Sequence, residues 1–66
     1  METNTLVTQR LLLTPREAAE ALRISDRKLW GLTASGEIPC VRIGRSVRYD
    51  ISDLQGWIEE RKEDNR

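Results

Sequence analysis

A chain of 66 residues can form one small domain, which buries only about 60% of the surface that its unfolded form exposes. One cysteine and no histidine exclude an intramolecular disulfide and leave no ligand set for a zinc site, and we expect no cofactor or metal. The net charge is zero, yet residues 23–48 hold six basic and two acidic side chains (net +4), between flanks of net −1 and −3. This basic middle third can create a local positive potential that favours a polyanionic partner.

We expect one domain over residues 11–60, preceded by a flexible segment (1–10) and followed by a frayed charged tail (61–66). Residues 1–10 are polar and lack the apolar run of a signal peptide, and no segment reaches transmembrane length. A single free cysteine, Cys40, suits a reducing compartment, so the expected localisation is cytoplasmic, without membrane contact. We interpret Cys40 as a small strand residue.

The first helix is predicted from Pro15 to about Leu22. Thr14 can cap it, Pro15 suits the first helical position, and Glu17 can close a capping box. Ala18 and Ala19 share a stripe with Leu22, so a second helix can approach closely.

Residues 23–25 are too few for anything but a tight turn before a second helix over residues 26–34, which Ser25 can cap and Ser35-Gly36 can end. At about 100° per residue, Leu29, Leu32 and Thr33 face the core. The opposite face is then formed by Arg27, Trp30, Gly31 and Ala34.

From Cys40 to Tyr49 apolar and polar residues alternate with period two, which predicts a β-hairpin. A two-residue Gly44-Arg45 loop would pair Arg42 with Val47 and mix the two faces. We therefore predict a three-residue loop, 44–46, that pairs Ile43 with Val47.

In this register Arg42 lies opposite Arg48, Arg45 lies at the tip, and the three arginines share one side of the ribbon. Like charges directly opposite destabilise a hairpin by up to about 1 kcal/mol. Phosphate contact would explain the arrangement, whereas the alternative is that both side chains turn into water.

A last helix is predicted after Asp50 or Ser52, with Leu54, Trp57 and Ile58 in the core. The leucines of residues 11–13 form an extended lead-in that packs beneath this helix.

Two helices joined by a tight turn, followed by a basic hairpin and a closing helix, are the parts of a winged helix-turn-helix, a mainly α fold with a small β-hairpin. The chain also resembles the excisionase family of small DNA-binding domains, within the wider MerR-like winged-helix group that includes AlpA-like phage regulators. The resemblance covers about residues 11–60, and it depends on the runs Leu12 to Ala19, Ser25 to Pro39 and Val41 to Tyr49, followed by Asp53, Leu54 and Trp57. It implies DNA binding by the Ser25-capped helix and by the Arg45-tipped wing.

The chain departs from this family at Gly31, where such domains often carry an arginine or another long polar residue, and near Ala34. A bare face indicates weak sequence discrimination. The alternative is that the helix approaches the base edges closely, with Ala34 against a thymine methyl group.

The candidate DNA-binding residues lie on the second helix and on the wing. Arg27, Lys28 and Trp30 would present the major-groove helix, although Trp30 could instead cover the edge of the core. Arg45 would enter the neighbouring minor groove, and Arg42, Arg48 and Ser46 would fix the register on phosphates. The full set is Ser25, Arg27, Lys28, Trp30, Gly31, Ala34, Arg42, Arg45, Ser46 and Arg48.

The predicted function is non-enzymatic binding of double-stranded DNA, with no small-molecule substrate, because the sequence lacks a nucleophile beside a base and a phosphate-cradling glycine loop. The resemblance favours an excisionase-like factor that acts in DNA recombination, with an integrase or cooperative copies on tandem sites as further partners. A small phage- or plasmid-type transcriptional regulator and a phage packaging subunit are alternatives that use the same domain. A hypothesis of another class is a protein-interaction module that docks on an acidic partner.

Overall fold

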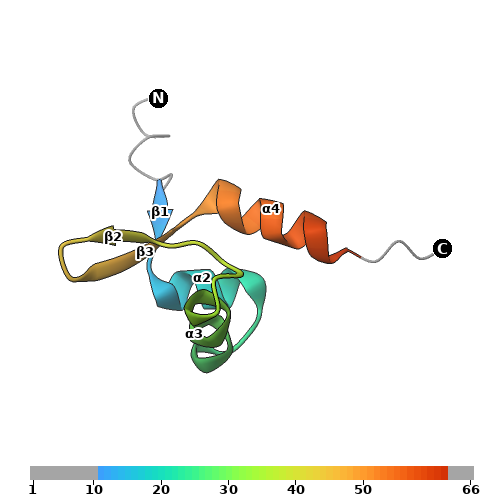
Figure 1. The fold of residues 1–66 in the computed structure, drawn as a ribbon, viewed down its shortest axis with the longest axis horizontal. Helices are drawn as coiled ribbons and strands as arrows, with labels where there is room; N and C mark the ends of the chain where they lie inside the picture. The colour runs from blue at the N-terminus through green and yellow to red at the C-terminus, as the bar shows by residue number, and fades with distance from the viewer. Residues whose placement is uncertain (1–10, 63–66) are drawn as a thin grey trace.

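The computed structural model describes residues 11–62 of the chain (Figure 1). Within these residues three helices pack against a small antiparallel sheet, so the predicted mainly α fold with a β-hairpin is confirmed. In chain order the elements are β1 (Leu12–Leu13), α2 (Pro15–Leu22), α3 (Asp26–Ala34), β2 (Val41–Ile43), β3 (Ser46–Asp50) and α4 (Ile51–Arg61). The predictions for residues 1–10 and 63–66 lie outside the described part of the chain.

The helix-turn-helix begins with the predicted capping box. Thr14 Oγ1 accepts from the Glu17 backbone N at 3.1 Å, and Glu17 Oε1 accepts from the Thr14 backbone N at 3.0 Å. α2 ends at Arg23, which takes the left-handed conformation, and α3 starts two residues later behind Ser25. Both helices have the predicted bounds, because their start signals are local and strong.

The hairpin register differs from the prediction. The loop has two residues, Gly44 and Arg45, and Arg42 pairs with Val47 while Val41 pairs with Arg48. Gly44 has φ +62°, as the first central residue of a II′ hairpin turn requires, and this turn fits the twist of the strands. The three-residue loop and the facing arginines were therefore wrong.

The register also decides which side chains share a face of the sheet, since antiparallel partners point the same way. The sheet order is β1-β3-β2. The inner face carries the buried Tyr49 with Leu13, Val47 and Arg42, and the opposite face, called here the outer wing face, carries Val41, Ile43, Ser46 and Arg48. The lead-in β1 is thus a strand paired with β3.

The core lies between α2, α3, α4 and the inner face of the sheet. Its buried members are Ala18, Ala19, Leu29, Ile38, Tyr49 and Leu54. Cys40 is partly buried against this cluster, but β2 begins one residue later at Val41, so the interpretation of Cys40 as a strand residue was wrong. No helix within residues 11–62 is long and apolar enough to cross a membrane.

α4 follows Asp50, whose Oδ1 accepts from the Ser52 backbone N at 2.9 Å. Leu54 is buried as predicted, but Trp57 is only partly buried and Ile58 is 37% exposed, so the expectation of a core position is wrong for Ile58. A single eleven-residue helix at the edge of the core can bury only one narrow stripe. α4 ends at Arg61, one residue beyond the predicted domain boundary.

Candidate nucleic-acid interface

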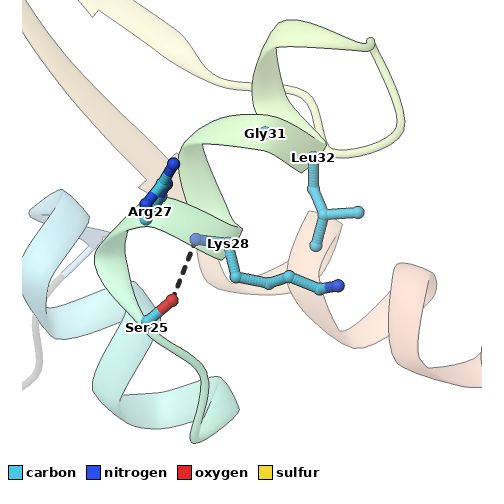
Figure 2. Close-up of a pocket in the computed structure, with 5 residues that line it drawn as sticks. All are labelled: Ser25, Arg27, Lys28, Gly31 and Leu32. Atoms are coloured by element: carbon cyan, nitrogen blue, oxygen red, sulfur yellow. Dashed lines mark hydrogen bonds between the residues drawn. The ribbon is translucent and has the colours of Figure 1, made fainter.

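α3 is held at its start by Ser25 and along its inner side by the core. Ser25 Oγ accepts from the Lys28 backbone N at 3.0 Å (Figure 2). Leu29 is 1% exposed, while Leu32 and Thr33 are partly buried. The inner face predicted for this helix is therefore confirmed, and its orientation on the domain is fixed.

The outward face of α3 carries the candidate residues Arg27, Trp30, Gly31 and Ala34, all exposed. Trp30 is 51% exposed, which resolves the open alternatives in favour of a surface position. Arg27 and Lys28 make no side-chain ion pair within residues 11–62, although cations in the first turn of a helix are mildly unfavourable. These two charges are available to a partner.

A shallow hollow lies on this face at Gly31. It is lined by Ser25, Arg27, Lys28, Gly31 and Leu32 (Figure 2). A Cβ built on Gly31 would meet no atom within 4 Å, so the fold itself does not require glycine here. Arg27 and Lys28 therefore place two cations beside Gly31.

The arginines that were predicted to share one side of the ribbon are distributed over both of its faces in the structure. Arg42 is exposed on the inner face, the side of the sheet that packs on the core, and Arg45 is exposed in the loop. Arg48 lies on the outer wing face, half-buried, and its Nη1 donates to the Val47 carbonyl at 2.8 Å. Arg42 therefore shares the inner face with Tyr49, which contacts α3, whereas Arg48 and the half-buried Ser46 lie on the opposite face.

A chain of hydroxyl groups connects α3 with the wing, which sequence reasoning missed. Thr33 Oγ1 donates to the Leu29 carbonyl at 2.9 Å, and it lies 2.7 Å from the Tyr49 hydroxyl. Because the single Thr33 hydroxyl hydrogen is used on Leu29, Tyr49 donates to Thr33. Tyr49 is 1% exposed, so this bond is shielded from water and ties β3 to the outward-facing helix.

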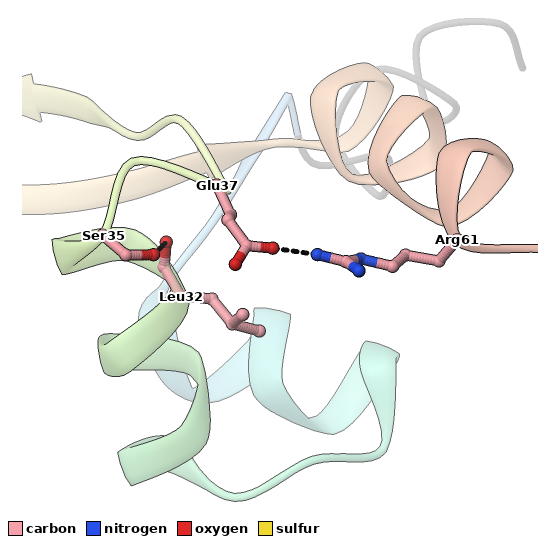
Figure 3. Close-up of polar contacts among 4 residues, drawn as sticks. All are labelled: Leu32, Ser35, Glu37 and Arg61. Carbon is pink, nitrogen blue, oxygen red and sulfur yellow. Dashed lines mark hydrogen bonds and ion pairs between the residues drawn. The ribbon is translucent and has the colours of Figure 1, made fainter.

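The end of α3 is fixed by a second set of contacts. The Glu37 backbone N donates to the Leu32 carbonyl at 3.0 Å around Gly36, whose φ is +86°. The Glu37 carboxylate pairs with Arg61 of α4 (Figure 3). The Arg61 guanidinium also lies 5.2 Å from the centre of the Trp57 ring, so α4 braces the segment that leads from α3 to the wing.

The model of a family described as "Helix-turn-helix domain" matches residues 12–62. The chain belongs to this family. The resemblance inferred from sequence is thereby confirmed, and the matched range begins at β1 and extends past the end of α4.

Among curated relatives of this helix-turn-helix domain, a Saccharopolyspora erythraea protein named "Probable excisionase" is 56% identical over 48 residues, covering 73% of this chain and 49% of the relative. A Mycobacterium tuberculosis protein named "Putative DNA-binding protein" is 38% identical over 48 residues, covering 73% of this chain and 62% of its own length. The chain thus spans about half to three-fifths of the relatives it matches. No solved structure matches it.

Proposed function

We propose that this chain is a non-enzymatic protein that binds double-stranded DNA through α3 and the wing. The observation that carries the proposal is the placement of Arg27 and Lys28, two exposed cations without an ion pair among the described residues, in the first turn of the second helix of a helix-turn-helix. That helix is the one which enters the major groove in proteins of this architecture. The names of both relatives support the same activity.

The wing extends the proposed interface beyond α3. Arg42 and Arg45 are exposed on the α3 side and at the tip, where they can reach phosphates or the neighbouring minor groove. Ser25, Gly31 and Ala34 line or flank the helix surface and allow the backbone to lie near the DNA. Among the predicted contacts, Arg48 and Ser46 have the weakest support, because they lie on the outer wing face.

A salt titration of DNA binding tests this proposal. Neutralising several phosphates makes affinity fall steeply with salt, so we expect at least a tenfold drop between about 50 and 200 mM salt for purified protein on a duplex. An affinity that stayed flat over this range, or no binding at any salt, would refute it. Binding that was specific to one acidic protein would instead favour the protein-interaction module.

Within DNA binding we favour the excisionase-like role in recombination over a transcriptional regulator, because the relative with the higher identity of the two is named an excisionase. Recovering bound fragments from sheared DNA of the source organism separates the two. Clusters of sites at an integration junction support the excisionase role, whereas promoter fragments support the regulator.

An integrase and neighbouring copies of the chain are the proposed protein partners. One domain with few phosphate contacts binds a single site weakly, so tight binding requires linked neighbours on tandem sites. Comparing one site with an array of sites in the same duplex length tests this expectation. Equal affinity for the single site and for the array would show that neighbouring copies of the chain do not bind cooperatively.

A further inference from the structure

Arg23 occupies the turn between α2 and α3 in an uncommon backbone conformation. Its φ and ψ are 62° and 42°, in the left-handed region. The Arg23 backbone N donates to the Glu20 carbonyl at 3.1 Å, and the Ile24 backbone N donates to the Ala19 carbonyl at 3.0 Å. These two bonds form a Schellman motif, in which the left-handed position is usually glycine.

The side chain at this position is unfavourable to the fold. Within residues 11–62, positive φ otherwise occurs only at Gly36 and Gly44. A residue with a Cβ is strained in this region, and only glycine, or to a lesser extent asparagine, adopts it readily. The Arg23 side chain is exposed and makes no hydrogen bond or ion pair within the described residues, so no contact there offsets the strain.

Arg23 is also close to the candidate interface. It precedes Ser25 by two residues, which places its Cα within about 7 Å of a residue that lines the hollow on α3. Arg27 and Lys28 line the same hollow. Arg23, Arg27 and Lys28 thus lie close together in the chain at the start of α3, none of them in an ion pair within the described residues. Each raises the local positive potential that a phosphate group meets there.

We propose that Arg23 is a further phosphate-contacting residue of the DNA interface. Its left-handed conformation lowers the stability of the free protein, whereas its positive charge raises the affinity for DNA. The proposal rests on DNA binding by α3. It adds the turn of the helix-turn-helix to the surface that lies along the DNA backbone.

The test compares Arg23→Gly, Arg23→Asn and Arg23→Lys in the full chain, measuring thermal unfolding and the salt dependence of binding to one duplex. Arg23→Gly should raise Tm by roughly 4–8 °C, the shift that relief of one left-handed residue gives in a domain of this size. Its DNA affinity should fall about three- to tenfold, and the slope of log K against log salt should flatten by about one unit.

The other two variants separate charge from conformation. Arg23→Asn should lose affinity and slope as Arg23→Gly does, with a smaller gain in Tm. Arg23→Lys should keep the slope and gain no Tm. An unchanged affinity and slope in Arg23→Gly would overturn the proposal, as would an unchanged Tm, which would show that Arg23 is not strained. If the wild-type chain itself bound no DNA, the proposed function would fail instead.

Discussion

Gly31 and Gly56 form a matched pair, because each is an exposed glycine inside a helix and a Cβ on either would meet no atom within 4 Å. Neither has a positive φ. Glycine in a helix interior is less favourable than alanine by roughly 0.8–1 kcal/mol. We therefore expect Gly31→Ala and Gly56→Ala each to stabilise the free protein by about this amount.

In so small a domain that gain corresponds to roughly 4–8 °C in Tm, which is measurable by thermal unfolding followed by circular dichroism. The two sites lie on different helices without a shared contact, so the double variant should show the sum of the two gains within about 0.5 kcal/mol. A loss of stability in either single variant would show that the added methyl group meets something and would refute the packing argument.

DNA binding distinguishes the two explanations of the bare face at Gly31. Gly31→Ala adds one methyl group beside Arg27 and Lys28 and brings it against no atom of the protein, so it should keep the wild-type affinity within about twofold, as Gly56→Ala should. This outcome fits weak sequence discrimination by a face that lacks a reading side chain. A loss of tenfold or more in Gly31→Ala alone would instead show that DNA approaches the helix backbone closely.

Three further substitutions test the placement of side chains around the interface. Tyr49→Phe removes the buried donor to Thr33 and should cost about 0.5–1.5 kcal/mol in a denaturant titration, whereas no cost would show that the hydroxyl pair is unimportant. Trp30→Ala should cost less than the roughly 3–5 kcal/mol of a fully buried aromatic residue, because the ring is 51% exposed, and should weaken DNA binding. Arg42→Thr should weaken DNA binding by about 1–2 kcal/mol and flatten its salt slope by about one unit, while Arg48→Thr should do much less. Equal losses in the two arginine variants would contradict their assignment to opposite faces.

The helix-turn-helix could be predicted from the sequence because its signals are local. Thr14 and Glu17 are three residues apart and satisfy each other's backbone donors, and Ser25 caps α3 in the same way. Such signals need no tertiary context. The helical spacing then predicted correctly that Leu29 is buried, whereas it left the position of Trp30 open, and the structure has that ring 51% exposed.

The hairpin register could not be predicted from alternation, because that argument assumes one buried face. Near the tip both faces meet solvent, since Ile43 is 57% exposed and Arg42 is exposed on the inner face. Burial therefore favours neither register there, and the turn decides. Gly44 has the positive φ that the two-residue turn requires at its first loop position, and this turn determines which side chains share a face.

The contacts that orient the candidate interface join residues far apart in the chain. Thr33 and Tyr49 are 16 residues apart, and Glu37 and Arg61 are 24 apart. Neither pair has a sequence spacing that marks it, because polar residues on different elements meet only when the elements pack. The exposed candidate residues could be proposed from sequence, whereas the contacts that hold α3 and the wing in place could not.

These supports determine how the small domain can bind DNA. The shielded bond from Tyr49 to Thr33 holds β3 against α3 in the free protein, so the helix and the wing need not be ordered again when a duplex binds. The free energy needed to order a segment on binding lowers the affinity, and a domain that makes few contacts has a low affinity from the start. The same bond fixes which side of the ribbon meets α3, so Arg42 shares that side with Tyr49, whereas Arg48 lies on the outer wing face.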